Sequence, residues 1–207
     1  MSNIVAIDAN YALDLEAGSA YRESNVYPYL QSKRFTMDLW VGPLATRANA
    51  EASAVEPDAK LLTGVGHGFP ASFLGDNQDP VWAVGAYAPQ EVSGRIAHFL
   101  SCSNAQTLGP DFVKHGCAAY IGYDNNFIYD PNNADAFFAC DGEIDRALAD
   151  GLTVGAAVTR AISVFRKTID DLNAQGDSSA AGMLAQSLSY LRSPLNNPKW
   201  GDVNATL

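Results

Sequence analysis

Short apolar runs separated by Gly, Pro and charged residues dominate the first 130 residues of the chain. Runs of this length, bounded by turn residues, are typical of buried strands in a parallel sheet. They predict strands over 3–7, 34–41, 60–64, 95–101 and 117–123, a short sixth strand over 127–130, and a strand or hairpin over 81–87 that flanks the sheet.

Helices are predicted between and after these strands. In the C-terminal third, apolar residues recur at helical spacing, while Pro and Gly mark other helix boundaries. The predicted helices cover 21–33, with Pro28 breaking or beginning the first one, then 44–54, 110–116, 141–150, 153–176 and 178–191. Alternating strands and helices favour an α/β fold with a mostly parallel, doubly wound sheet flanked by helices. Without a linker or internal repeat, residues 1–207 are predicted to form a single domain.

Composition narrows the class of protein. The chain is 47% hydrophobic and 17% charged, which is too apolar for a disordered protein. A formal net charge of −10 disfavours a nucleic-acid partner. The sequence has neither a signal-peptide core nor an apolar run of about 18 residues, so we expect a cytoplasmic protein that does not span a membrane. Export by a route without a local signal is the alternative.

Cysteine usage argues against a metal site. The three cysteines, Cys102, Cys117 and Cys140, lack the paired C-x-x-C spacing of a zinc site. We therefore expect reduced thiols, no metal and no cofactor. Cys117 and Cys140 are interpreted as packing thiols, His98 as a histidine inside a strand, and His115 as a helix C-cap.

Polar groups that can do chemistry follow several of the predicted strands. Asp8, His67, Cys102 and Asp124 each stand where an apolar run ends. In open α/β sheets, ligands bind beyond the carboxyl ends of the strands. A thiol beside an imidazole is the smallest set of groups that can make a cysteine act as a nucleophile. The alternatives are a buried core cysteine, a histidine satisfied in a turn, and a carboxylate that caps a helix or closes an Asx turn.

The arrangement of these pieces resembles a known family. An apolar strand ends in His67-Gly68, the run V-W-A-V-G-A-Y follows, and a later strand ends in S-C-S-N around Cys102. The strand C-A-A-Y-I-G-Y-D and the ending K-W-G-D-V-N-A-T-L, with Val203 where proline is usual, extend the pattern. This order resembles caspase-like (clan CD) cysteine peptidases, nearest to the gingipain-like and CHAT-type branches.

The resemblance implies a three-layer caspase-like sandwich acting as a cysteine endopeptidase on a peptide or protein substrate. It implies Cys102 as the nucleophile and His67 as the general acid/base, with an oxyanion hole of backbone N–H groups near Gly68 and Cys102. Several branches select Arg or Lys through an acidic residue in the pocket. One position used for that residue is Leu100 here, so Asp8 and Asp124 are the candidate substrate-binding residues.

Two other functions stay open at this point. A caspase-like domain can be catalytically silent and act as an interaction module with partner proteins in a signalling or defence assembly. The same thiol and imidazole can also serve another acyl-transfer enzyme, such as a thioesterase or an amidase.

Overall fold

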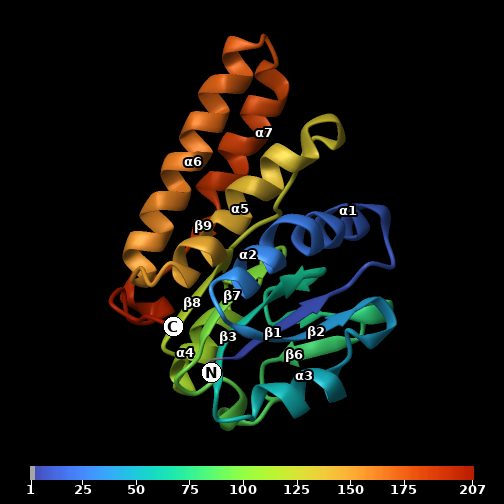
Figure 1. The fold of residues 1–207 in the computed structure, drawn as a ribbon, viewed down its shortest axis with the longest axis vertical. Coiled ribbons are helices and arrows are strands. Elements are labelled where there is room, and N and C mark those ends of the chain that lie inside the picture. The colour runs from blue at the N-terminus through green and yellow to red at the C-terminus, as the bar shows by residue number, and fades with distance from the viewer. Residues whose placement is uncertain (1–2) are drawn as a thin grey trace.

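A six-stranded sheet forms the centre of the protein (Figure 1). The computed structural model describes residues 3–207. The strands lie in the order β2-β1-β3-β7-β8-β9. Their bounds are β1 (Asn3–Asp8), β2 (Thr36–Val41), β3 (Ala59–Val65), β7 (Ile96–Leu100), β8 (Ala119–Tyr123) and β9 (Leu191–Arg192). All neighbours run parallel except β9, which pairs antiparallel with β8. The predicted α/β class and mostly parallel sheet are confirmed.

Helices cover both faces of this sheet, as Figure 1 shows. One face carries α1 (Leu13–Tyr21), α2 (Tyr27–Ser32), α5 (Ala134–Ala149) and α6 (Val154–Ala174), and the other carries α3 (Arg47–Ala54) and α4 (Leu108–Lys114). Alternate residues of β1 enter the two cores, with Ile4 in one and Val5 in the other. A strand buried on both faces needs a continuous apolar run, which is why the sequence signal was strong. The last helix, α7 (Ser178–Ser189), packs along α6 and extends with it away from the sheet.

A second, smaller sheet is inserted between β3 and β7. It consists of β4 (Gly68–Phe69), β5 (Ser72–Leu74) and β6 (Pro80–Ala83), all antiparallel. The strand predicted around 81–87 is therefore present and flanks the main sheet. The insertion begins directly after His67, so it borders the carboxyl edge of β3.

The structure corrects the predicted course of residues 13–32. They form one continuous helical stretch, in which a π-helical turn at Arg22–Val26 joins α1 to α2. The helix thus begins well before residue 21, and Pro28 does not end it. Proline lacks the N–H that an α-helix would use, and the wider turn just before it lets the helix continue.

The predicted sixth strand is also corrected. Residues 127–130 form no strand, and β9 takes the sixth place in the sheet. The Ser187 hydroxyl accepts a hydrogen bond from the Ile128 N–H and donates one to the Ile128 carbonyl. A side chain therefore satisfies the backbone groups that a strand partner would have used.

Three helix starts differ from the prediction. Thr46 caps α3, so that helix begins at Arg47, later than expected. The helix α4 begins at Leu108 and contains Pro110 in its first turn, and α5 begins at Ala134 rather than at residue 141. The long helix α6 begins as predicted, because the Thr153 hydroxyl accepts a hydrogen bond from the Ala156 N–H.

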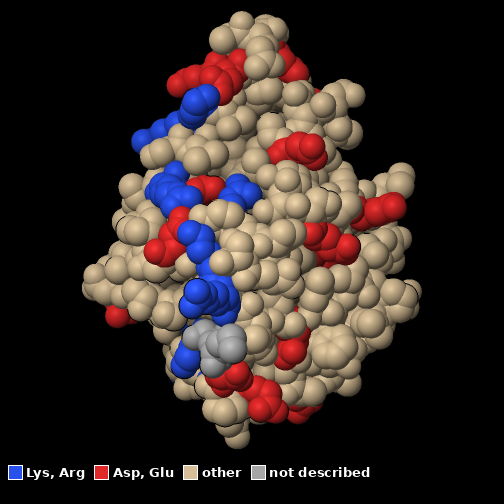
Figure 2. Space-filling view, in the orientation of Figure 1, with Lys and Arg blue, Asp and Glu red and all other residues tan. Residues whose placement is uncertain are grey.

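Positive charge on one face gathers in a stripe that runs down from α6, with Asp and Glu interspersed (Figure 2). Arg160 on α6 and Lys33 beyond α2 both pair with Asp150, at 2.7 Å each. Asp150 therefore neutralises part of the positive charge close to α6.

Candidate active site

His67 and Cys102 stand at equivalent positions just beyond two neighbouring strands, β3 and β7. Val65 and Leu100 form the last pair between β3 and β7. Each candidate catalytic residue stands two positions beyond its strand. The Gly66 N–H donates to the Leu100 carbonyl at 3.3 Å, which holds the two chain ends together. The carboxyl edge of the sheet thus brings the predicted thiol and imidazole to one place.

Gly68 packs directly on the backbone that carries the thiol. A Cβ at position 68 would overlap Ser101 Oγ and would lie 2.5 Å from the Cys102 carbonyl oxygen. Only glycine allows this approach. The contact places the Gly68 backbone beside that of Cys102, where the oxyanion hole is expected.

The chain turns sharply just after Cys102. Ser103 adopts a left-handed conformation with φ 61°, which is uncommon for a residue with a side chain. Its N–H donates to the Asn125 carbonyl at 3.1 Å. The turn is thereby pinned to the segment that follows β8, and Cys102 stands at its tip.

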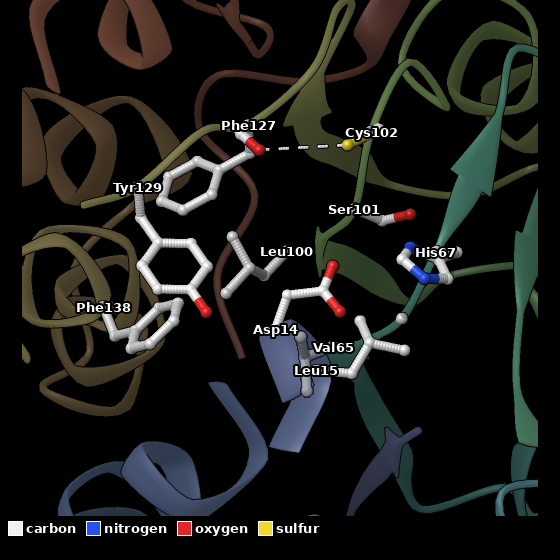
Figure 3. Close-up of a pocket in the computed structure, with 11 residues that line it drawn as sticks. Asp14, Leu15, Val65, His67, Leu100, Ser101, Cys102, Phe127, Tyr129 and Phe138 are labelled. Atoms are coloured by element: carbon white, nitrogen blue, oxygen red, sulfur yellow. Dashed lines mark hydrogen bonds between the residues drawn. The ribbon is translucent and has the colours of Figure 1, made fainter. Parts of the chain in front are cut away.

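The imidazole and the thiol line a common pocket of about 50 Å³ (Figure 3). Its apolar walls come from Leu15, Val65, Leu100, Phe127, Tyr129 and Phe138. Asp14, from the first turn of α1, is the charged residue of the lining, and in Figure 3 its carboxylate lies between Leu100 and His67.

Asp14 was not predicted from the sequence. Asp14 stands in the first turn of α1, where the helix N-terminus favours a negative charge. The signal that could have found it is its place just after β1, at the carboxyl edge of a parallel sheet.

The thiol of Cys102 faces Phe127 rather than the imidazole. Its Sγ lies 4.0 Å from the Phe127 carbonyl oxygen, and Figure 3 shows His67 on the other side of Ser101. Within residues 3–207, no hydrogen bond joins Cys102 to His67. Burial raises the pKa of the Cys102 thiol, and the charge of Asp14 raises that pKa further. Both effects favour the protonated form of the thiol. The His67 ring is held by an edge contact with Tyr11, at 5.7 Å between centroids.

Asp8 does not reach this pocket, which corrects its expected role in substrate binding. The residue is fully buried, and its partners lie within the protein. Oδ1 accepts from the Val65 N–H at 3.0 Å, and Oδ2 accepts from the Tyr27 hydroxyl at 2.6 Å. Arg22 Nε lies 3.5 Å from Oδ1. Burial raises the pKa of Asp8 to about 6, against the opposing effect of Arg22.

Asp8 belongs to a buried charge cluster between the sheet and α5. Arg22 also pairs with Asp145 at 2.9 Å, and His98 Nδ1 lies 2.7 Å from the same carboxylate. His98 Nε2 is 3.3 Å from Asp141 Oδ1, which is close enough for an ion pair although the hydrogen-bond alignment is poor. Burial lowers the pKa of His98, but Asp145 and Asp141 outweigh this and raise it to about 9.

Asp124, the other predicted substrate-binding residue, also lies outside the pocket lining. Its Oδ2 accepts from Arg192 Nε at 2.6 Å, and its N–H donates to the Tyr190 carbonyl. The carboxylate is occupied in tying β9 to the end of β8. Contact of Asp124 with substrate stays a prediction.

The remaining cysteines and histidines match their structural interpretations. Cys117 and Cys140 are buried, and burial raises their thiol pKa values to about 12 and about 11. His115 is the C-cap residue of α4 and lies 2.8 Å, through Nδ1, from the Asp111 carbonyl oxygen. In the part of the chain that the structure describes, no group of His, Cys, Asp and Glu is arranged to hold a metal ion. No helix within 3–207 is both long and apolar enough to cross a bilayer.

Comparison with solved structures places this fold among known ones. The chain matches the crystal structure of gingipain R, an Arg-specific cysteine proteinase, with a TM-score of 0.64 and 11% identity, covering 99% of this chain and 47% of that one. It matches the complex of the Porphyromonas gingivalis RgpB pro- and mature domains with a TM-score of 0.59 and 12% identity, covering 100% and 48%. The chain thus spans about half the length of the gingipain chains. It has their caspase-like α/β fold, as the sequence predicted. No model of a protein family matches the sequence, and no curated protein matches it.

Proposed function

We propose that this protein is a cysteine peptidase in which Cys102 and His67 form the catalytic dyad. One observation carries the proposal: His67 and Cys102, which follow two neighbouring strands and are far apart in sequence, line the same pocket at the carboxyl edge of the sheet. The caspase-like fold adds support, because the fold it shares with gingipain R also serves a cysteine proteinase.

The reaction begins when the Cys102 thiolate attacks the scissile carbonyl carbon. A C–S bond forms and the carbonyl oxygen becomes an oxyanion, which accepts hydrogen bonds from the N–H groups of Gly68 and Cys102. His67 gives a proton to the leaving amine as the C–N bond breaks, leaving a thioester. His67 then takes a proton from water, whose oxygen attacks the thioester, releasing the acid and restoring the thiol.

The dyad needs one side-chain movement before this reaction. The thiol faces the Phe127 carbonyl, and a change of the Cys102 χ1 rotamer would turn it toward His67. Proton transfer to the imidazole would then create the thiolate beside a positive charge, which lowers a thiol pKa. We propose that substrate binding favours this second rotamer.

The pocket suits a basic side chain before the scissile bond. Leu100, Phe127 and Tyr129 give apolar walls for an aliphatic stem, and Asp14 gives a carboxylate for the guanidinium or ammonium group. Asp14 thus takes the role that the sequence assigned to Asp8 and Asp124.

A silent interaction module is the second candidate function. The observation in its favour is the thiol itself, which is directed away from the imidazole and whose pKa is raised by burial. If that geometry persisted with peptide bound, the pocket would bind a basic side chain without cleaving the chain.

Internally quenched peptides that carry Arg, Lys, Asp or Asn before the scissile bond test the proposal, with cleavage sites read by mass spectrometry. We expect cleavage after Arg and Lys, and a loss of about a thousandfold or more in Cys102→Ala. Cys140→Ser is the matched control, because this buried cysteine lies outside the pocket lining. Failure of the wild type to cleave any peptide would leave the interaction module. Hydrolysis of thioesters alone would favour the other acyl-transfer enzymes.

A further inference from the structure

A second hollow adjoins the candidate dyad on the side of the small sheet. It measures about 370 Å³ and shares four lining residues with the first pocket, namely Asp14, His67, Cys102 and Phe127. The rest of its lining comes from Gly68, Phe69, Leu74, Gln78, Asn126 and Ile128. The two hollows are therefore continuous at the dyad, and a peptide lying across Cys102 would enter both.

Phe69 is the apolar residue that this hollow leaves most exposed. Its side chain is 59% exposed, which is unusual for a large aromatic residue on a two-residue strand. Phe69 stands two positions beyond His67, so its place is fixed by the same strand that follows the imidazole. An apolar ligand group placed there would remove the ring from water.

The loop beside Phe69 holds unfavourable backbone geometry. Asn77 and Gln78 have φ values of 51° and 66°, two successive left-handed residues that carry side chains. Each such residue costs on the order of 1 kcal/mol or more, and such costs gather at binding sites. Hydrogen bonds from Gly75 N–H to the Asp79 carbonyl and from Asp79 N–H to the Asp76 carbonyl hold the loop, and Gln78 lines the hollow.

The position of the imidazole determines which half of a peptide substrate contacts Gly68 and Phe69. His67 must reach the leaving amine, so the leaving half of the peptide lies on its side of the thiol. The wall made by Gly68 and Phe69 directly follows His67 in the chain. The residue that comes just after the scissile bond is therefore the one nearest Phe69.

We propose that Phe69 forms a binding site for a large apolar side chain immediately after the scissile bond, which rests on the proposed peptidase function. The preferred substrate then has a basic residue followed by Leu, Ile, Met or Phe. An acidic residue at the second position is disfavoured, because Asp76 and Asp79 flank Gln78 and Asp14 lines the hollow.

Peptides with Arg before the scissile bond and Leu, Phe, Gly or Asp after it test this site. We expect kcat/KM to be about tenfold or more higher for Leu and Phe than for Gly, a range that hydrophobic pockets reach. Phe69→Ala should reduce that ratio to within about threefold. Val84→Ala is the matched control, since Val84 is an exposed apolar residue next to β6 that lies outside the hollow. The Val84→Ala variant should keep the full ratio of kcat/KM between Leu or Phe peptides and Gly peptides.

Binding measurements separate this inference from the peptidase proposal. The same peptides, labelled with a fluorophore, are titrated into Cys102→Ala and into Cys102→Ala with Phe69→Ala, and anisotropy gives Kd. Tighter binding of the Leu peptide that depends on Phe69 supports the apolar site, even if the wild type cleaves nothing and the peptidase proposal falls. Equal affinity for Leu and Gly peptides, or a preference that survives Phe69→Ala, overturns the inference whether or not cleavage occurs.

Discussion

The Sγ atom of Cys102 lies 4.0 Å from the carbonyl oxygen of Phe127, and this pairing separates the resting thiol from His67. The segment after β8 therefore sets the state of the candidate nucleophile. The hydrogen bond from the Cys102 thiol to the Phe127 carbonyl is weak, because a thiol is a poor hydrogen-bond donor. A small favourable free energy of contact with a bound peptide is enough to break this hydrogen bond.

Alkylation measures that resting state. Without peptide, iodoacetamide should label Cys102 slowly, with a rate that rises as the pH passes the ordinary thiol range, because burial raises the pKa of this thiol. Cys117 and Cys140 should stay unlabelled in the folded protein, since both are buried. Peptide mapping by mass spectrometry gives the rate at each cysteine. Rapid labelling of Cys102 at pH 6 would instead reveal a thiolate already paired with His67.

Asp14 should control the preference for basic peptides. Asp14→Asn removes the pocket charge, so kcat/KM for Arg peptides should fall about tenfold to a hundredfold, the usual value of a charge-assisted hydrogen bond. Glu16→Gln removes an exposed carboxylate from the same helix outside the pocket and should change little. Steady-state kinetics on Arg and Asn peptides gives both effects. An equal loss on both peptides would assign Asp14 to general positioning rather than to charge recognition.

Gly68→Ala tests the close contact beneath the candidate oxyanion hole. The added methyl group would overlap Ser101 Oγ, so we expect a loss of activity and a fall of about 1–3 kcal/mol in the free energy of unfolding. Gly182→Ala is the control, because its Cβ would have open space within a helix, where alanine is favoured. Urea unfolding and peptide cleavage are measured together. A fully active Gly68→Ala protein would contradict the placement of this backbone.

Removing the buried guanidinium should destabilise the protein strongly. Arg22→Met leaves Asp8 and Asp145 buried without their common cation, which costs about 3–5 kcal/mol in comparable sites. Arg166→Met, at an exposed position on α6, should stay within about 0.5 kcal/mol of the wild type. Urea midpoints measure both. A stable Arg22→Met protein would mean that the cluster retains its charges without this cation.

The buried histidine predicts a pH dependence of stability. The pKa of His98 is about 9 in the folded protein, against an ordinary value of 6.5, so the folded state holds the proton more tightly. This stabilisation is complete below pH 6.5 and is lost as the pH rises toward 9. The unfolding free energy should therefore fall by about 1.5 kcal/mol between pH 6.5 and 8.

That pH window isolates His98 from its neighbours. The pKa of Asp8 is raised to about 6 and that of Asp145 is lowered to about 2, so their contributions change below the window. The buried thiols contribute above it. Urea titrations at several pH values should show the slope in the wild type and a flat line in His98→Gln. A wild type with constant stability across this window would contradict a charged His98.

The central strands β1, β3, β7 and β8 could be predicted because they are buried on both faces. Such burial demands an uninterrupted apolar run, and the polar residue that follows it, His67 or Cys102, stands out in the sequence. The helix that carries Asp14 gives no comparable signal. Its residues L-D-L-E-A-G-S-A-Y lack a clear apolar stripe, and no side chain caps its N-terminus at Ala12.

Rotamers and ion pairs cannot be predicted from sequence patterns, for a different reason. Whether the Cys102 thiol faces Phe127 or His67 is a choice between staggered states that the same backbone permits. The partner of the buried Asp8 is Arg22, the first residue of a π-helical turn, and neither the pairing nor the turn leaves a pattern in the sequence.

Asp8 supports the end of the strand that leads to the imidazole, because its carboxylate accepts a hydrogen bond from the Val65 N–H, two residues before His67. A mutational scan that measures only the loss of peptide cleavage would therefore not distinguish substitutions of Asp8 from substitutions of Asp14. Comparing substrates of different charge separates them: a change at the first should depress turnover of every peptide alike, whereas a change at the second should alter which peptide is chosen.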